Sequence, residues 1–241
     1  MTFPVRHFIE LDSTNSEAAR LAASGAAGPL WIVAEHQTAG RGRRGRVWQG
    51  ASGNLAATLL LTTDKAPAEA AQVAFVAALA LADMAAAFVT PAFVRVKWPN
   101  DLLVGGAKAG GVLIETGAAP GGGLWLAVGI GVNLAEAPSD TPYPATSLMA
   151  HGATPSRDAA LEALDAAFAH WLKVWEEGGF EPVRAAWTAR AHGLGEACTV
   201  VQGERLVTGI NDGLDADGAL LLRVGAAVQR ITAGDVIFGG A

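Results

Sequence analysis

The longest apolar run of the chain, residues 66–89, sets the strongest limit on its fold. Only Glu69, Gln72 and Asp83 interrupt this run. A membrane span of about 20 apolar residues rarely tolerates three such side chains, so the run predicts a helix buried in a protein core, with Pro67 in its first turn. A chain of 241 residues with 51% hydrophobic content can supply that core, as one large domain or as a large and a small one.

Short apolar segments separated by turn residues predict a sheet for this helix to pack against. A capping-box spacing at Thr14-Asn15-Ser16-Glu17 predicts the start of a first helix that Gly25 ends, and three-and-four spacing predicts two later helices at 157–177 and 180–191. Two strands flank the "GGAK" hairpin. Strands are expected at 6–11, 30–35, 54–62, 93–98, 102–104, 111–115 and 124–134. The fold class predicted is therefore α+β, with a mixed, mainly antiparallel sheet and helices.

From Gly193 onward the pattern changes to short alternating strands broken by glycine and aspartate. About 45 residues of this kind predict a small C-terminal β-barrel. The segment "NDGLDADG" within it resembles a calcium loop, but the carboxylates that such a loop needs at its first and last positions are missing, so an ordinary hairpin turn is expected. The tryptophans at 171, 175 and 187 are expected in the core.

Composition excludes several classes of function. The single cysteine, Cys198, allows no internal disulfide and no cysteine-cluster metal site, which fits a cytoplasmic protein. A net charge of −6 argues against general nucleic-acid binding. No charged segment precedes an apolar stretch at the N-terminus, so export is not expected. No helix-turn-helix segment is recognised there either.

The segment "GRGRRGRVW", residues 40–48, concentrates four arginines and three glycines in this acidic chain. It lacks the lysine and hydroxyl of a Walker A loop. Like charges repel and glycines are costly to order, so the empty loop is expected to be mobile and to become ordered around an anionic ligand. Trp48 offers a flat face to a planar ring, which suits a nucleotide or an acyl adenylate. A solvated basic loop or an RNA contact remains the alternative.

A second cationic segment, "VKWPNDLLVGGAKAGG", contains Lys97 and Lys108, two of the four lysines of the chain. Lys97 begins a turn that Pro99 stiffens, and Lys108 is expected on a turn beside small residues, where it can reach a ligand. Asn100 and Asp101 can either cap the local backbone or, for Asp101, bind magnesium.

Five motifs together resemble those of biotin protein ligases, in order and spacing. They are DSTN (12–15), EHQTAGRGRRGRVW (35–48), KWPNDLL (97–103), KAGGVLIE (108–115) and GIGVNL (129–134). The resemblance covers residues 6–192 and implies a catalytic domain related to class II aminoacyl-tRNA synthetases over 1–192, with an SH3-like β-barrel domain over 193–241. It also implies the two-step reaction in which biotin and MgATP form biotinyl-5'-adenylate, which a lysine of a biotin carboxyl carrier protein then attacks.

The resemblance assigns roles by motif position. Arg43 and Lys108 are the expected catalytic residues. The biotin pocket is expected from Ser13, Thr14, Asn15, Gln37, Gly40, Arg41, Gly42, Arg43, Lys108 and Gly111. ATP binding is expected from Arg46, Trp48, Lys97, Asn100 and Asn133, and a magnesium ion from Asp101.

The partners expected are the carrier domain and no membrane, and homodimerisation is left open. Some members of this family also bind DNA through an N-terminal winged helix-turn-helix, and no DNA binding is expected of this chain. Lipoate protein ligase and octanoyltransferase share the fold and a reactive lysine, but "GRGRRGR" and "KWPND" favour biotin. A non-enzymatic binding module is the rival class. The base for the acceptor lysine is not identified, and His36, which adjoins the loop, is expected to be a packing or surface residue.

Overall fold

A computed structural model describes residues 2–239. A seven-stranded sheet forms its centre, with strand order β1-β2-β3-β7-β6-β5-β4. Strand β1 runs parallel to β2, and every other neighbouring pair is antiparallel. The strands are β1 (Val5–Leu11), β2 (Leu30–Gln37), β3 (Leu55–Thr63), β4 (Val94–Lys97), β5 (Asp101–Val104), β6 (Ala107–Ala118) and β7 (Leu124–Val132). The predicted mixed, mainly antiparallel sheet is confirmed.

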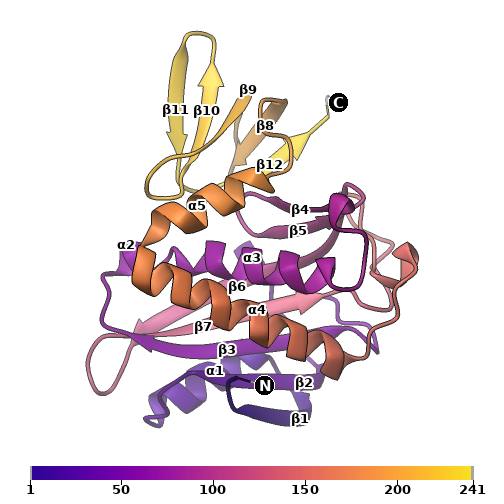
Figure 1. The fold of residues 1–241 in the computed structure, drawn as a ribbon, viewed down its shortest axis with the longest axis vertical. Coiled ribbons are helices and arrows are strands. Elements are labelled where there is room, and N and C mark those ends of the chain that lie inside the picture. The colour runs from indigo at the N-terminus through magenta and orange to yellow at the C-terminus, as the bar shows by residue number, and fades with distance from the viewer. Residues whose placement is uncertain (1, 240–241) are drawn as a thin grey trace.

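Helices cover both faces of this sheet unequally (Figure 1). One face packs against α3 (Val73–Ala86), which α4 (Arg157–Gly178) and α5 (Phe180–Ala189) cover in turn. The other face carries only α1 (Thr14–Ala23), over a small core around Ile32 and Leu60. Much of that second face is therefore open for a ligand.

The apolar run is buried as predicted, although it forms two helices. The short α2 (Pro67–Ala70) precedes α3. Between them the backbone forms tighter turns, in which Gln72 N–H donates to Glu69 O and Ala74 N–H donates to Ala71 O. Two of the three polar residues that interrupt the run have partners in α4, because Asp83 accepts from Trp171 Nε1 at 2.6 Å and Gln72 accepts from Trp175 Nε1 at 2.9 Å. The third, Glu69, pairs with Lys65. Residues 67–86 are long and apolar enough to cross a membrane, yet most of this stretch is buried in the core.

The capping-box prediction is wrong. Helix α1 has Ser13 at its N-cap, without a side-chain capping bond. Both Thr14 donors, the backbone N–H and the hydroxyl, bond to Gln37 Oε1 at 2.8 and 3.2 Å, and Glu17 pairs with Arg20 instead. A tertiary partner on β2 thus outcompetes the local motif. The other end behaves as predicted, since Gly25 has a φ of +89° just after the helix.

A five-stranded antiparallel sheet forms the C-terminal part, in the order β11-β10-β9-β8-β12. Its strands are β8 (Ala197–Gln202), β9 (Arg205–Leu214), β10 (Leu220–Val224), β11 (Ala227–Ile231) and β12 (Asp235–Phe238). The "NDGLDADG" segment forms the expected hairpin turn, in which Asp215 Oδ1 accepts from two backbone N–H groups.

This second sheet docks against the first part of the chain near β4 and α5 (Figure 1). Trp98 Nε1 donates to the carbonyl oxygen of Gly218 at 3.1 Å. A Cβ on Gly218 would overlap Phe75, so only glycine lets the β9–β10 turn approach this closely. The edge strand β12 is thereby held beside the open face of the large sheet.

Candidate active site under an arginine-rich flap

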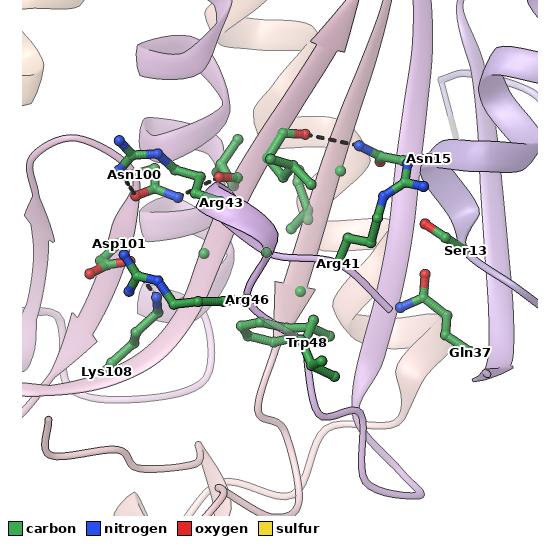
Figure 2. Close-up of a pocket in the computed structure, with 18 of the residues that line it drawn as sticks. Ser13, Asn15, Gln37, Arg41, Arg43, Arg46, Trp48, Asn100, Asp101 and Lys108 are labelled. Atoms are coloured by element: carbon green, nitrogen blue, oxygen red, sulfur yellow. Dashed lines mark hydrogen bonds and ion pairs between the residues drawn. The ribbon is translucent and has the colours of Figure 1, made fainter. Parts of the chain in front are cut away.

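A pocket lies on the open face of the large sheet, beneath residues 40–48, which we call the flap. Neutral polar side chains gather at one end and charged side chains at the other, with the flap crossing between them (Figure 2). The pocket measures only about 90 Å³, against roughly 300–1,000 Å³ for typical ligand sites. Arg41, Arg43, Arg46 and Trp48 of the flap line this space.

The polar end is built at the turn between β1 and α1, where Ser13, Thr14 and Asn15 are all buried. Asn15 is fixed on both sides, because its Oδ1 accepts from Thr58 at 2.7 Å and its Nδ2 donates to Glu115 at 2.8 Å. Gln37 Oε1 is occupied by Thr14, which leaves the Gln37 amide nitrogen free to act as a donor. This end is preorganised to bind a neutral polar group.

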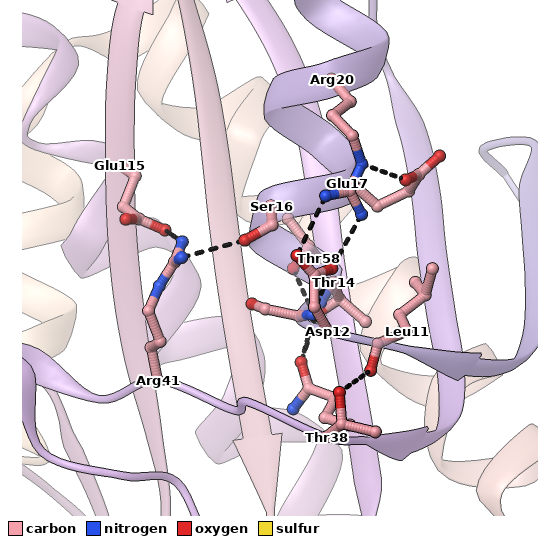
Figure 3. Close-up of polar contacts among 12 residues, drawn as sticks. Leu11, Asp12, Thr14, Ser16, Glu17, Arg20, Thr38, Arg41, Thr58 and Glu115 are labelled. Atoms are coloured by element: carbon pink, nitrogen blue, oxygen red, sulfur yellow. Dashed lines mark hydrogen bonds and ion pairs between the residues drawn. The ribbon is translucent and has the colours of Figure 1, made fainter.

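Glu115 anchors the flap at this same end (Figure 3). Arg41 donates to Glu115 Oε2 at 2.7 Å and to Ser16 Oγ at 2.9 Å. The flap itself is a tight hairpin, closed by the bonds Gly42 N–H to Arg46 O (2.7 Å) and Trp48 N–H to Gly40 O (3.0 Å). Arg44 at its tip has a φ of 56°, a left-handed conformation that is strained for a side chain of this kind.

Glycines on the strands form the floor of the pocket. Cβ atoms on Gly129 and Gly131 of β7 would overlap Asn15 and the Trp48 ring, respectively. A Cβ on Gly111 of β6 would make ordinary van der Waals contact with the Lys108 side chain, at 3.5 Å from its Cε. Gly40 is buried, and a Cβ there would lie 2.7 Å from the Trp48 carbonyl oxygen and 3.1 Å from Gln37 Nε2. The missing side chains let Trp48 lie directly against the sheet.

Lys108 lies on strand β6, although it was expected on the hairpin turn. The turn consists of Gly105 and Gly106 alone, both with positive φ. The ladder to β5 shifts register beside Lys108, so that Ala109 is an extra residue between the pairs Leu103↔Lys108 and Leu102↔Gly110. This bulge turns Lys108 toward the same side as Gly111, which is the pocket side.

Asp101 is shared by two ammonium groups at the charged end. Lys108 Nζ lies 2.5 Å from its Oδ1 and Lys97 Nζ lies 3.1 Å from its Oδ2. Burial alone would raise the pKa of Asp101. The two lysines lower this pKa by more than burial raises it, so the pKa of Asp101 lies below its ordinary value. The group is therefore a stable anionic counter-ion.

Arg43 projects into the charged end and is half-buried. It donates to Asn100 Oδ1 at 3.0 Å and to the carbonyl oxygen of Gly234 at 3.3 Å. Asn100 Nδ2 in turn donates to Val112 O at 2.6 Å, which fixes the amide. Burial lowers the pKa of Arg43, and the Asp235 carboxylate acts in the opposite direction. A partly desolvated guanidinium of this kind binds an anion more strongly than one in water.

The arginines have a counter-ion within the chain, whereas only an anionic ligand was expected to order this loop. Asp235, the first residue of β12, pairs with Arg46, with Arg44 at 3.3 Å and with Arg43 at 3.6 Å. The flap is thus held by Asp235 at one end and by Glu115 at the other. Sequence reasoning missed Asp235 because it is 189 to 192 residues away from these partners.

Replacing Asp235 with asparagine should loosen the flap. Exposed ion pairs contribute about 0.2–1 kcal/mol each, and three arginines share this carboxylate. Because trypsin cleaves after arginine, we expect cleavage within residues 41–46 of the ligand-free protein to become about three- to tenfold faster. The control is Asp212→Asn, which breaks the pair with Arg223 away from the flap. Equal cleavage of Asp235→Asn and the wild type would contradict this account.

Most of the predicted site residues line this one pocket. They are Ser13, Thr14, Asn15, Gln37, Arg41, Gly42, Arg43, Arg46, Trp48, Asn100, Asp101, Lys108 and Gly111. Gly40 lies behind it, Lys97 lines the neighbouring cavity, and Asn133 is buried with its Nδ2 bonded to Thr146 O. The Asn133 N–H also donates to Ala109 O at 2.8 Å, so Asn133 supports the bulge next to Lys108. His36 is exposed on β2.

Eight further pocket residues were missed, and four of them bear on the argument. Tyr143 and Asp235 belong to segments in which no motif was recognised, while Gly129 and Gly131 lie in the motif GIGVNL, of which only Asn133 was given a role. Glycine at alternate positions of a strand indicates close approach of another group, and that signal could have identified the two glycines.

A second cavity of about 400 Å³ lies between the large sheet and β12. It shares Arg46, Asp101, Lys108, Tyr143 and Asp235 with the pocket, so these side chains form the partition between the two spaces. Its other walls are mostly apolar, including Trp98, Val236 and Phe238. A ligand anion that draws the arginines away from Asp235 would join the two spaces.

The residues present do not form a protein-held magnesium site. No cluster of three or more histidine, cysteine, aspartate or glutamate side chains occurs among residues 2–239. Asp101 has an ammonium group on each carboxylate oxygen, which leaves it poorly suited to a divalent cation. The prediction that Asp101 holds magnesium therefore gains no support from the geometry.

Comparisons with known proteins agree with this geometry. The model of the biotin/lipoate A/B protein ligase family matches residues 8–134, and that of the biotin protein ligase C-terminal domain matches residues 193–239. A biotin–[acetyl-CoA-carboxylase] ligase of Paracoccus denitrificans is 43% identical over 95% of this chain and 98% of its own length. The bifunctional ligase/repressor BirA of Bacillus subtilis is 32% identical over 95% of this chain and 72% of its own length.

Solved structures show the same arrangement. The biotin protein ligase of Aquifex aeolicus in complex with biotin and ATP has a TM-score of 0.83 and 27% identity, covering 99% of each chain. The Leishmania major biotin protein ligase in complex with biotinyl-5-AMP has a TM-score of 0.67 and 25% identity, covering 95% of this chain and 99% of its own.

Proposed function

This chain belongs to the biotin protein ligases, and from that premise we propose that it attaches biotin to a lysine of a biotin carboxyl carrier domain. In the first step a carboxylate oxygen of biotin attacks the α-phosphorus of ATP, and pyrophosphate leaves. In the second step the lysine amine attacks the carbonyl carbon of biotinyl-5'-adenylate, AMP leaves and the amine loses a proton. The observation that carries the proposal is the convergence of all five motifs on one pocket with a neutral end and a cationic end.

The neutral end suits the ureido ring of biotin. Asn15 and the Gln37 amide offer fixed hydrogen-bonding groups there. With the ring at that end, the biotin carboxylate would lie toward Arg43 and Lys108. Trp48 then offers its ring to the adenine, and its buried Nε1 has no partner among the described residues.

The cationic end suits the reacting phosphate. Two anions must meet there, and Arg43, Arg46 and Lys108 supply positive charge from three directions. Asp101 holds Lys108 in position without adding a free negative charge, because it is already neutralised by two lysines. Magnesium enters as part of MgATP, bound by the phosphates. The flap closes over the product and keeps water from the mixed anhydride until the acceptor arrives.

Strand β6 offers a docking edge for the acceptor. Its pairing with β5 ends at Gly111, so Ile114–Ala118 has a neighbouring strand on one side only. An apolar groove beside this stretch, lined by Pro67, Ala70 and Ala74 among others, reaches Arg43 and Asn100 of the pocket. A strand that paired with β6 would bring its lysine toward the adenylate. A second copy of the chain could use the same edge, which would make dimerisation and acceptor docking compete.

Thr116→Pro tests this edge. The Val112 N–H points away from β7 to Asn100 O, so strand alternation points the Thr116 N–H outward as well. Proline there removes an outward donor without breaking the β6–β7 ladder. We expect the KM for the carrier domain to rise about tenfold while biotin-dependent pyrophosphate release is unchanged. An unchanged KM would exclude this docking mode.

The function itself is tested by pyrophosphate release from ATP with biotin, with lipoate or with neither. Only biotin should give a signal, followed by labelling of a purified carrier domain. A signal with lipoate alone would identify a lipoate ligase, and RNA retention on filters at moderate salt without any pyrophosphate would identify a binding module. The cytoplasm is the proposed location, because ATP is available there and the one cysteine, Cys198, is buried and unpaired.

A further inference from the structure

Tyr143, the only tyrosine of the chain, lies against the side chain of Lys108. The Lys108 ammonium is 5.2 Å from the centre of the Tyr143 ring, within the range of a cation–π contact. Its other close partner is Asp101 Oδ1 at 2.5 Å. The ammonium group is therefore held between a carboxylate and an aromatic face.

The segment that carries Tyr143 is attached to the backbone of the same lysine. Lys108 N–H donates to Pro144 O at 2.9 Å, Thr146 N–H donates to Lys108 O at 2.8 Å, and Ala145 forms a parallel bridge with Lys108. Pro142 and Pro144 flank the tyrosine and restrict the backbone on both sides. The Thr141 hydroxyl donates to Tyr143 O at 2.6 Å. The ring and the lysine thus form one unit.

Lysine by itself is a poorly positioned cation, since its stem has four rotatable bonds. Asp101 alone does not fix Lys108, because this carboxylate also binds Lys97. When a phosphate enters, it competes with Asp101 for the ammonium, whereas the uncharged ring remains a partner throughout. Tyr143 also lines both the pocket and the second cavity, as Lys108 does.

We propose that Tyr143 is a positioning residue for adenylate formation, which acts by holding the Lys108 ammonium against the reacting phosphate through its ring face. The proposal rests on the function given above. It requires the aromatic ring and not the hydroxyl. Tyr143→Phe should therefore preserve the effect, and Tyr143→Leu, which is apolar but not aromatic, should remove it.

The kinetic test measures kcat and KM for pyrophosphate release in Tyr143→Phe, Tyr143→Leu and the loop control Ser139→Ala. We expect Phe and the control to stay within twofold of the wild type. Leu should lower kcat about three- to thirtyfold with the KM for biotin unchanged. Equal loss in Phe and Leu, or an unchanged kcat in Leu, would overturn the proposal. A raised KM for ATP with normal kcat would assign the ring to the nucleotide instead.

A second readout does not depend on activity. Reductive ¹³C-methylation keeps the charge of lysine, and the chain has four lysines, so the NMR spectrum contains four lysine methyl signals. The Lys108 signal, assigned with Lys108→Arg, should be shifted by the ring current of Tyr143. This shift should persist in Tyr143→Phe and disappear in Tyr143→Leu. A Lys108 signal that is the same in all three would refute the contact, while a wild type without biotin-dependent pyrophosphate release would refute only the function.

Discussion

Replacement of Lys108 by alanine is expected to slow biotin-dependent pyrophosphate release by about 10²- to 10³-fold, the usual loss for one preorganised donor at a developing charge. The physical reason is the position of its side chain, which is only 16% exposed and lines the pocket beside Gly111. Bulk water cannot replace a cation in so enclosed a place. Asp101 would moreover be left with Lys97 as its only cationic partner, which adds net negative charge where the phosphate must bind.

The measurement is single-turnover pyrophosphate release at saturating biotin and ATP, with the thermal melting temperature as a check on folding. Lys173→Ala is the matched control, because this lysine is 71% exposed on α4 and pairs only with Glu177. Should Lys108→Ala release pyrophosphate at a rate close to that of the wild type, Lys108 would lose its catalytic role, and with it the argument for Tyr143.

The sheet could be predicted from the sequence because its signals are local. Apolar runs of strand length and glycine turns such as Gly105-Gly106 are present in short windows, and the structure has strands at all seven predicted places. The buried helix followed from residues 66–89 in the same way. Two of its polar residues, Gln72 and Asp83, accept hydrogen bonds from tryptophans of α4. The sequence did not predict these partners.

The sequence predicted which residues belong to the site much better than it predicted their arrangement. Motif residues could be assigned to one pocket, but the face on which Lys108 lies depends on a register shift between β5 and β6, and this shift is a property of strand pairing. The capping-box prediction failed for a similar reason, because Thr14 bonds to a side chain 23 residues away. The pairing of Asp235 with the flap was invisible for a similar reason, since no local pattern reports contacts between distant segments.

The flap arginines have an internal counter-ion, Asp235. We therefore expect substrate binding to exchange this carboxylate for anions of the substrate. Arg43 is placed to respond most strongly to that exchange. It contacts Asn100 of the pocket wall as well as Gly234 in the C-terminal part, whereas Arg44 points to Asp235 and does not line the pocket.

Arg43→Gly is therefore expected to fold normally but to release its adenylate. A charge-assisted hydrogen bond contributes about 1.5–3 kcal/mol, so the dissociation rate of biotinyl-5'-adenylate should rise by about 10- to 100-fold. Adenylate released into solution reacts with any exposed amine, and unrelated proteins in the mixture should become biotinylated. The measurements are the loss of preformed adenylate on rapid gel filtration and the labelling of a bystander protein that carries no acceptor sequence.

The matched control for this variant is Arg44→Gly, which removes an equal charge from the same flap. Glycine suits the left-handed φ of 56° at position 44, so this change relieves strain and leaves the pocket lining intact. We expect Arg44→Gly to retain the adenylate and to label only the carrier domain. Equal leakage from both variants would mean that total flap charge, rather than the contact of Arg43 with the pocket wall, retains the intermediate. Full retention by Arg43→Gly would show that the flap stays closed without it, held by Arg41 on Glu115 and Arg46 on Asp235.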